Sequence, residues 1–299
     1  MHAAKLGASA VLSSLLLSGC VDTELCVPVE TRFAFFSQGD CVLTRAGFFQ
    51  GHEWLTYFAN ADLDATDRFT DEETRQIAEG NRRIDWPKEL LVHMNASVLS
   101  YANALTDYTN RPENQRLHFL LTDKNGSEEA VQDSVEEIRD VSIEAIELWN
   151  FNRDRALTLI GRANHIVQDS FSAAHAARDV ERSWCIIKVK AYIPRAQGFL
   201  TPDVEFHGGN DGDTIGHTTT EDSIYRAGRD CHEPDGAARV EACLSETAQR
   251  GRLATRDYLR LVREATARYV ADQGEAADPG EVLDEAFEAF VVDHFSFCP

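Results

Sequence analysis

Three side chains that commonly bind metal ions lie close together in residues 161–176, GRANHIVQDSFSAAHA, of this 299-residue chain. His165 and Asp169 are four residues apart, so on an α-helix both would project from one face, about a turn apart. This spacing lets one helix give two ligands to one metal ion. His175 would lie about 240° further round an unbroken helix, where it reaches a second metal but not the first. The alternative is a core helix with hydrogen-bonded histidines.

A second pair with the same spacing follows at His217 and Glu221, on a predicted helix start. Mixed imidazole and carboxylate ligation suits Zn²⁺ and also admits Mn²⁺ or Fe²⁺. Two or three divalent ions close together are suited to hydrolysis of phosphate esters, because they lower the pKa of a bound water and stabilise the leaving oxygen. No side-chain nucleophile motif and no glycine-rich nucleotide loop is present in the sequence.

These patterns resemble the zinc-dependent phospholipase C / P1 nuclease family. The resemblance spans roughly residues 51–221 in short islands that follow the family's order: GHEWLTYFA (51–59), GNRRIDWP (80–87), RLHFL (116–120), GRANHIVQDSFSAAH (161–175) and HTTTE (217–221). The resemblance implies an all-α fold and a cluster of two or three zinc ions that hydrolyses phosphodiesters with a metal-activated water.

The resemblance also implies a ligand set, one metal at a time. The first metal would be held by Asp85, His118, His165 and Asp169, and the second by His175, His217 and Glu221. A third would share Asp169 and use His52.

Two of these ligands have open alternatives. Asp85 would also orient or deprotonate the water, but Asp62, Asp64 and Asp67 compete for its place as the carboxylate of the first metal, and Asp85 also suits a simple helix N-cap. In the family the third zinc binds an N-terminal Trp, whereas about 30 residues of the mature chain precede His52 here. The third site is therefore rebuilt or lost, and the other interpretation of His52 is a structural residue at a helix start.

The N-terminal residues 1–20 predict a targeting segment with Lys5, an apolar run and a lipobox that ends at Cys20. Acylation of Cys20 would anchor an exported bacterial lipoprotein, and Val21 in place of Asp predicts the outer membrane or cell surface. The alternative is an ordinary cleaved signal with Cys20 in a disulfide.

Cysteine count and charge add further constraints. Without Cys20, the other six of the seven cysteines fit three disulfides, for which we favour Cys26–Cys41, Cys231–Cys243 and Cys185–Cys298. The formal net charge of −21 argues against docking on duplex DNA but permits a small phosphodiester or a phospholipid head group, since bound Zn²⁺ reverses the local field.

The expected fold class is an all-α bundle, with residues 21–299 forming one domain and a long irregular insertion before the last metal ligands. We predict helices over about 49–60, 71–82, 87–108, 127–150, 154–178, 237–273 (with a break near Gly251) and 280–295, a loop over 110–114, and a hairpin strand in IIKVKAYI.

The function expected from these features is that of a monomeric phospholipase C-like phosphodiesterase. A P1-type single-strand nuclease and a non-catalytic metal-binding envelope lipoprotein are the alternatives.

Overall fold

The computed structural model describes residues 52–85, 104, 108, 111–121, 126–172, 175–192, 204–205, 244, 246–271 and 278–299. This part of the chain is mostly helical, with one antiparallel hairpin and one short parallel strand pair. None of its helices has the length and apolar character needed to cross a bilayer. The helices are α3 (His52–Ala61), α4 (Asp71–Asp85), α7 (Pro112–Gln115), the 3-10 turn η3 (Arg116–His118), α8 (Ser127–Leu148), α9 (Arg153–Asp169), α11 (Glu246–Ala271) and α12 (Pro279–Phe295).

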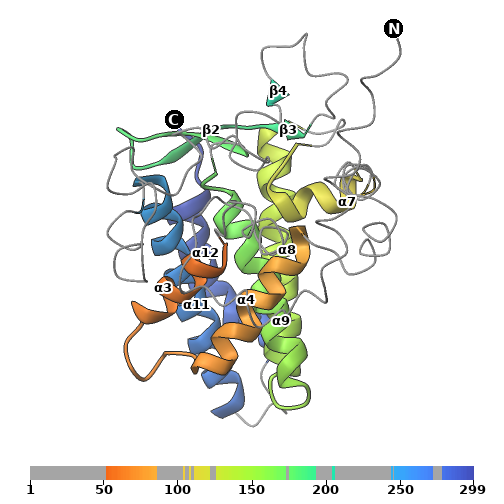
Figure 1. The fold of residues 1–299 in the computed structure, drawn as a ribbon, viewed down its shortest axis with the longest axis vertical. Coiled ribbons are helices and arrows are strands. Elements are labelled where there is room, and N and C mark those ends of the chain that lie inside the picture. The colour runs from red at the N-terminus through yellow and green to blue at the C-terminus, as the bar shows by residue number, and fades with distance from the viewer. Residues whose placement is uncertain are drawn as a thin grey trace, which may run out of the picture.

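Helix α9 is central in this arrangement, because it contacts α3, α4, α8, α11 and η3 (Figure 1). Twelve of its 17 residues are buried, and from Ala163 to Asp169 burial is continuous around the helix. A helix buried on all sides is normally apolar, and any polar side chain within it must find a partner inside the protein. The C-terminal half of α9 carries four such side chains, Asn164, His165, Gln168 and Asp169.

Helices α4 and α9 approach one another at a glycine on each. A Cβ added at Gly80 would lie 2.3 Å from the carbonyl oxygen of Thr158, which is closer than any side chain tolerates. Only glycine therefore allows the two backbones to touch at this crossing.

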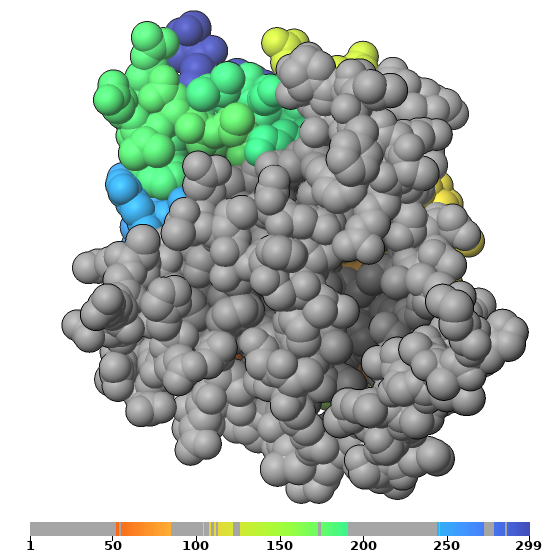
Figure 2. Space-filling model, turned by 45° about the horizontal axis from the view of Figure 1, so that its top comes forward, coloured from red at the N-terminus to blue at the C-terminus, as the bar shows by residue number. Residues whose placement is uncertain are grey.

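The strands form a small β-structure beside the C-terminus. Strands β1 (Ala176–Asp179) and β2 (Cys185–Val189) pair antiparallel, and β3 (Ala191–Tyr192) pairs parallel with β4 (Val204–Glu205). The Cys185–Cys298 disulfide confirms the predicted pairing, and Ile186 forms a bridge with Phe297. Figure 2 shows the hairpin of β1 and β2 (green) beside the C-terminal residues (dark blue) on the surface.

The end of α9 differs from the prediction. The helix was expected to continue to about residue 178, but it ends at Asp169, and β1 begins at Ala176. The Ser170 hydroxyl donates to the carbonyl of Val167, and the Arg178 Nε donates to the carbonyl of Ser170 at 2.7 Å. These donors satisfy carbonyls at the helix end, so no further turn is needed to pair them.

Other boundaries agree more closely. Asn152 caps α9, as one of the two predicted starting residues, by accepting from the backbone of Arg155. The loop predicted over 110–114 is partly wrong, because α7 begins at Pro112. Helix α11 begins at Glu246, later than expected, and it passes through Gly251 without the predicted break. In the helix predicted over 87–108, only Ala104 and Tyr108 are described, and both are helical.

Candidate metal centre

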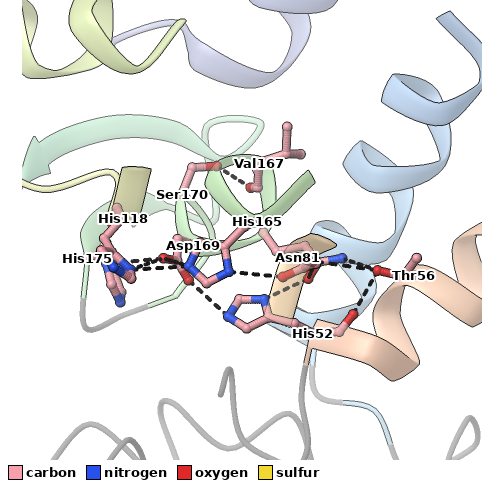
Figure 3. A network of polar contacts seen from close by, with 10 residues as sticks. His52, Thr56, Asn81, His118, His165, Val167, Asp169, Ser170 and His175 are labelled. Atoms are coloured by element: carbon pink, nitrogen blue, oxygen red, sulfur yellow. Dashed lines mark hydrogen bonds and ion pairs between the residues drawn. The ribbon is translucent and has the colours of Figure 1, made fainter. Parts of the chain in front are cut away.

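Four histidines from separate parts of the fold surround the carboxylate of Asp169 (Figure 3). His52 is the first residue of α3, His118 lies in η3, His165 lies one turn before Asp169 on α9, and His175 lies in the turn that follows α9. All are buried. The spacing of His165 and Asp169 on one helix face is as predicted, and the structure adds His52, His118 and His175 to the same cluster.

The two oxygens of Asp169 face different imidazoles. Oδ2 lies 2.9 Å from Nε2 of His165 and 3.3 Å from Nδ1 of His118. Oδ1 lies 3.2 Å from Nε2 of His52. Burial by itself raises the pKa of Asp169, but the nearby imidazoles of His165 and His175 and hydrogen bonds from His118 and His165 outweigh it and hold that pKa well below its ordinary range. The carboxylate is therefore an ionised ligand.

The distances fit a metal site. Nδ1 of His118 lies 3.1 Å from Nε2 of His165, and both face the same carboxylate oxygen. Two ligand atoms on a tetrahedral zinc ion with bonds of about 2.0–2.1 Å lie about 3.3–3.4 Å apart, so the three atoms already have nearly the required spacing. On the other side, His52, His165 and Asp169 each offer a ligand atom within 4.8 Å of the others. This buried group can hold a metal ion.

The position of His175 follows from the early end of α9. The sequence argument that His175 cannot share a metal with Asp169 assumed a continuous helix, and the turn removes that constraint. Nδ1 of His175 lies 3.9 Å from Oδ2 of Asp169 and donates a hydrogen bond to the backbone carbonyl of His118. Because a carbonyl only accepts, this bond places the proton of His175 on Nδ1 and leaves Nε2 as its ligand nitrogen.

Behind the histidines lies a group of buried polar residues that the sequence analysis did not identify. Nδ1 of His165 contacts Oδ1 of Asn81 at 2.9 Å, and Nδ1 of His52 contacts Oε1 of Gln168 at 2.7 Å. Thr56 lies beyond them and contacts Gln168 and Asn164 (Figure 3 labels Thr56 and Asn81). The only sequence signal was the presence of two amides, Asn164 and Gln168, beside the ligands of α9.

The acidic candidates for the first metal have different surroundings. Asp85 is the last residue of α4 and not part of a loop, and its role as a ligand stays a prediction. Both oxygens of Asp62 are bound by Arg252, which commits that carboxylate to a salt bridge with α11. Asp64 is exposed, and Asp64 and Asp67 belong to the turn after α3, with a backbone hydrogen bond between them.

The remaining predicted positions lie outside the described residues. These are His217 and Glu221, the lipobox Cys20, and the cysteines Cys26, Cys41, Cys231 and Cys243.

Comparison with known proteins adds no relative. No family model, no curated protein and no solved structure matches the chain.

Proposed function

We propose that this protein is a metal-dependent phosphodiesterase with a phospholipase C-like preference for small phosphodiesters or lipid head groups. The observation that supports it best is the shared carboxylate of Asp169, whose two oxygens face separate sets of imidazoles. A carboxylate used in this way can bridge two divalent ions, which is the arrangement that phosphoryl-transfer centres use.

The described residues divide into two sides around that carboxylate. His118 and His165 would hold one ion together with Oδ2 of Asp169, and His52 would lie beside a second ion at Oδ1. Asp85 is proposed to complete the first side, and His175 to join His217 and Glu221 around a further ion. Neutral imidazoles and carboxylates are ligands that Zn²⁺ accepts readily.

Bound divalent ions supply Lewis-acid stabilisation of phosphate oxygens and make water a stronger nucleophile at neutral pH. The protein contributes the buried negative charge of Asp169, which attracts the ions, and a set of imidazoles fixed in position. The formal net charge of −21 repels long polyanions, so short or membrane-bound phosphodiesters are the better substrates. A lipid anchor at Cys20 would hold the enzyme near such head groups.

The first test is metal content and hydrolysis on protein expressed without residues 1–20. We expect two or three zinc ions per chain by mass spectrometry, and cleavage of bis(p-nitrophenyl) phosphate that is lost with a chelator and restored by Zn²⁺. Phosphatidylcholine micelles and single-stranded DNA, compared at equal phosphate, separate the phospholipase from the nuclease.

Variants connect the reaction with the cluster. Asp169→Asn should lose metal from both sides, whereas His52→Ala should lose one ion and keep the one beside His118 and His165. His165→Ala should abolish hydrolysis while the circular dichroism signal stays close to that of the wild type. A wild-type protein that binds no zinc after reconstitution, or a fully active His165→Ala variant, would exclude this function.

A further inference from the structure

We infer that Thr56, Gln168 and Asn81 are positioning residues that fix which nitrogen of His52 and of His165 carries a proton. The inference rests on the proposed metal centre for its purpose, but it follows from hydrogen-bond directions that need no metal. All five side chains are buried at 0% exposure, so water does not compete for these bonds.

The direction of the network is set at a backbone carbonyl. The Thr56 hydroxyl lies 2.8 Å from the carbonyl oxygen of His52, and because a carbonyl only accepts, the hydroxyl must donate its single hydrogen there. Every other group at Thr56 Oγ1 must therefore be a donor. Those groups are the side-chain amides of Asn164 at 2.8 Å and Gln168 at 3.2 Å, and each must present its NH₂ group.

The same logic then fixes Gln168. With its NH₂ group directed at Thr56, its Oε1 points the other way, at 2.7 Å from Nδ1 of His52 and 3.1 Å from Nδ2 of Asn81. An amide oxygen only accepts, so Nδ1 of His52 carries a hydrogen. The amide of Asn81 is also oriented, because its NH₂ group must face Gln168.

The last step reaches the second histidine. Since the NH₂ group of Asn81 is committed to Gln168, its Oδ1 is the atom that faces Nδ1 of His165 at 2.9 Å. That nitrogen must also carry a hydrogen. Both histidines therefore direct Nε2 at the carboxylate of Asp169, at 3.2 Å for His52 and 2.9 Å for His165.

This arrangement prepares the histidines for a cation. Two acceptors that face each other at such distances need a proton or a metal ion between them, and a protonated Nδ1 keeps Nε2 as the ligand atom. Second-layer hydrogen bonds of this kind orient metal-binding histidines, and their loss typically lowers metal affinity by about 10- to 100-fold. Neutral amides and a hydroxyl do this here without adding charge to the site.

The direct test is nuclear magnetic resonance of ¹⁵N-histidine-labelled protein, with long-range ¹H–¹⁵N correlations for His52 and His165. We expect hydrogen on Nδ1 of both residues in the metal-free protein and again after addition of Zn²⁺. Hydrogen on Nε2 alone in the metal-free wild type would overturn the inference. Because this measurement needs neither a variant nor activity, it remains decisive even if the wild type binds no zinc and the proposed function fails.

The matched variants are Thr56→Val, Thr56→Ser and Thr74→Val. Thr74 is a suitable control because its hydroxyl also donates to a carbonyl four residues earlier, that of Thr70, and also accepts from an amide, that of Asn60. Thr56→Val should let the Gln168 amide turn over and weaken Zn²⁺ binding about 10- to 100-fold in competition with a chromogenic chelator. Thr56→Ser and Thr74→Val should keep wild-type affinity. Folded Thr56→Val protein with unchanged affinity and unchanged histidine signals would refute the role of Thr56.

Discussion

Gly161 of α9 lies so close to Ile77 of α4 that a Cβ at position 161 would be 2.1 Å from the Ile77 carbonyl oxygen and 2.6 Å from the backbone nitrogen of Asn81. Close helix contact is therefore linked to the metal centre, because Asn81 is the residue that reaches His165. An asparagine side chain is short, and it spans the gap only where the two backbones touch.

Gly161→Ala should consequently disturb both stability and the centre. The added methyl group meets backbone atoms that cannot turn aside, so α4 and α9 must separate, at a cost of about 1–3 kcal/mol in the free energy of unfolding. Urea denaturation measures that cost, and zinc titration should show weaker binding. Gly126→Ala is the control, because a Cβ there meets nothing within 4 Å. Equal stability of the Gly161→Ala and wild-type proteins would contradict this account of the helix crossing.

Glu137 of α8 joins two segments that carry proposed ligands. Its buried carboxylate binds Arg116, two residues before His118, at 3.0 Å, and Arg162, three residues before His165, at 2.5 Å. Glu137→Gln keeps the shape but removes the charge from both pairs. Because both arginines are partly exposed and screened by solvent, we expect a loss of about 1–2 kcal/mol by urea denaturation. Glu136→Gln, on the exposed side of α8, should have little effect, and a similar loss from both variants would argue against a specific clamp.

The sequence predicted what depends on local spacing. His165 and Asp169 share a helix face because they are four residues apart, and Cys185 was assigned to Cys298 after the local cysteine pairs had been made. The end of α9 was not predictable in this way, since no glycine or proline marks it and the Ser170 carbonyl is satisfied by Arg178 from the next strand. Long-range contacts of this kind have no periodic signal.

The positioning residues of the site show the same limit. Asn81 is 84 residues from His165, and Gln168 is 116 residues from His52, so only the packing of α3 and α4 on α9 reveals their function.

Glu73 provides a test by pH. Its carboxylate accepts from the backbone of Thr70 at 2.9 Å at the start of α4 and also binds Arg153 at the start of α9. Burial by itself raises the pKa of Glu73, but the hydrogen bonds from Thr70 and Arg153 outweigh it and lower that pKa below its ordinary value of 4.5. A lowered folded-state pKa means that the ionised form stabilises the protein above pH 4.5, and that this stabilisation disappears as the pH falls through the folded-state pKa.

Glu73→Gln should therefore cost about 1 kcal/mol at pH 7, where a cap and an ion pair are lost, and progressively less as the pH falls below the ordinary glutamate value. Thermal unfolding of both proteins between pH 3 and pH 7 measures the difference. The exposed Glu72, paired with Arg75 on the surface, is the control for general charge effects. A difference that stays constant over that range would show that ionisation of Glu73 does not contribute.

Arg178 is a buried cation without a carboxylate partner among its printed contacts, and it joins the ends of two helices. Its guanidinium donates to the backbone carbonyls of Ser170 at 2.7 Å, Trp184 at 2.8 Å and His294 at 3.0 Å, and it lies 4.1 Å from the ring centroid of Phe171. Burial lowers the pKa of Arg178 to about 9, which leaves it charged at neutral pH. The carbonyl ends of α9 and α12 favour that charge.

Arg178→Met should be among the more damaging single changes in the described part of the chain, because it leaves three backbone carbonyls without their donor. We expect a loss of roughly 3 kcal/mol or more by urea denaturation. Arg178→Lys keeps the charge but not the planar fork of donors, so its loss should be intermediate. The control is Arg182→Met in the turn of the same hairpin, where the side chain is 64% exposed and the loss should be small. If Arg178→Met were as stable as Arg182→Met, the end of α9 would have to depend on contacts other than this arginine.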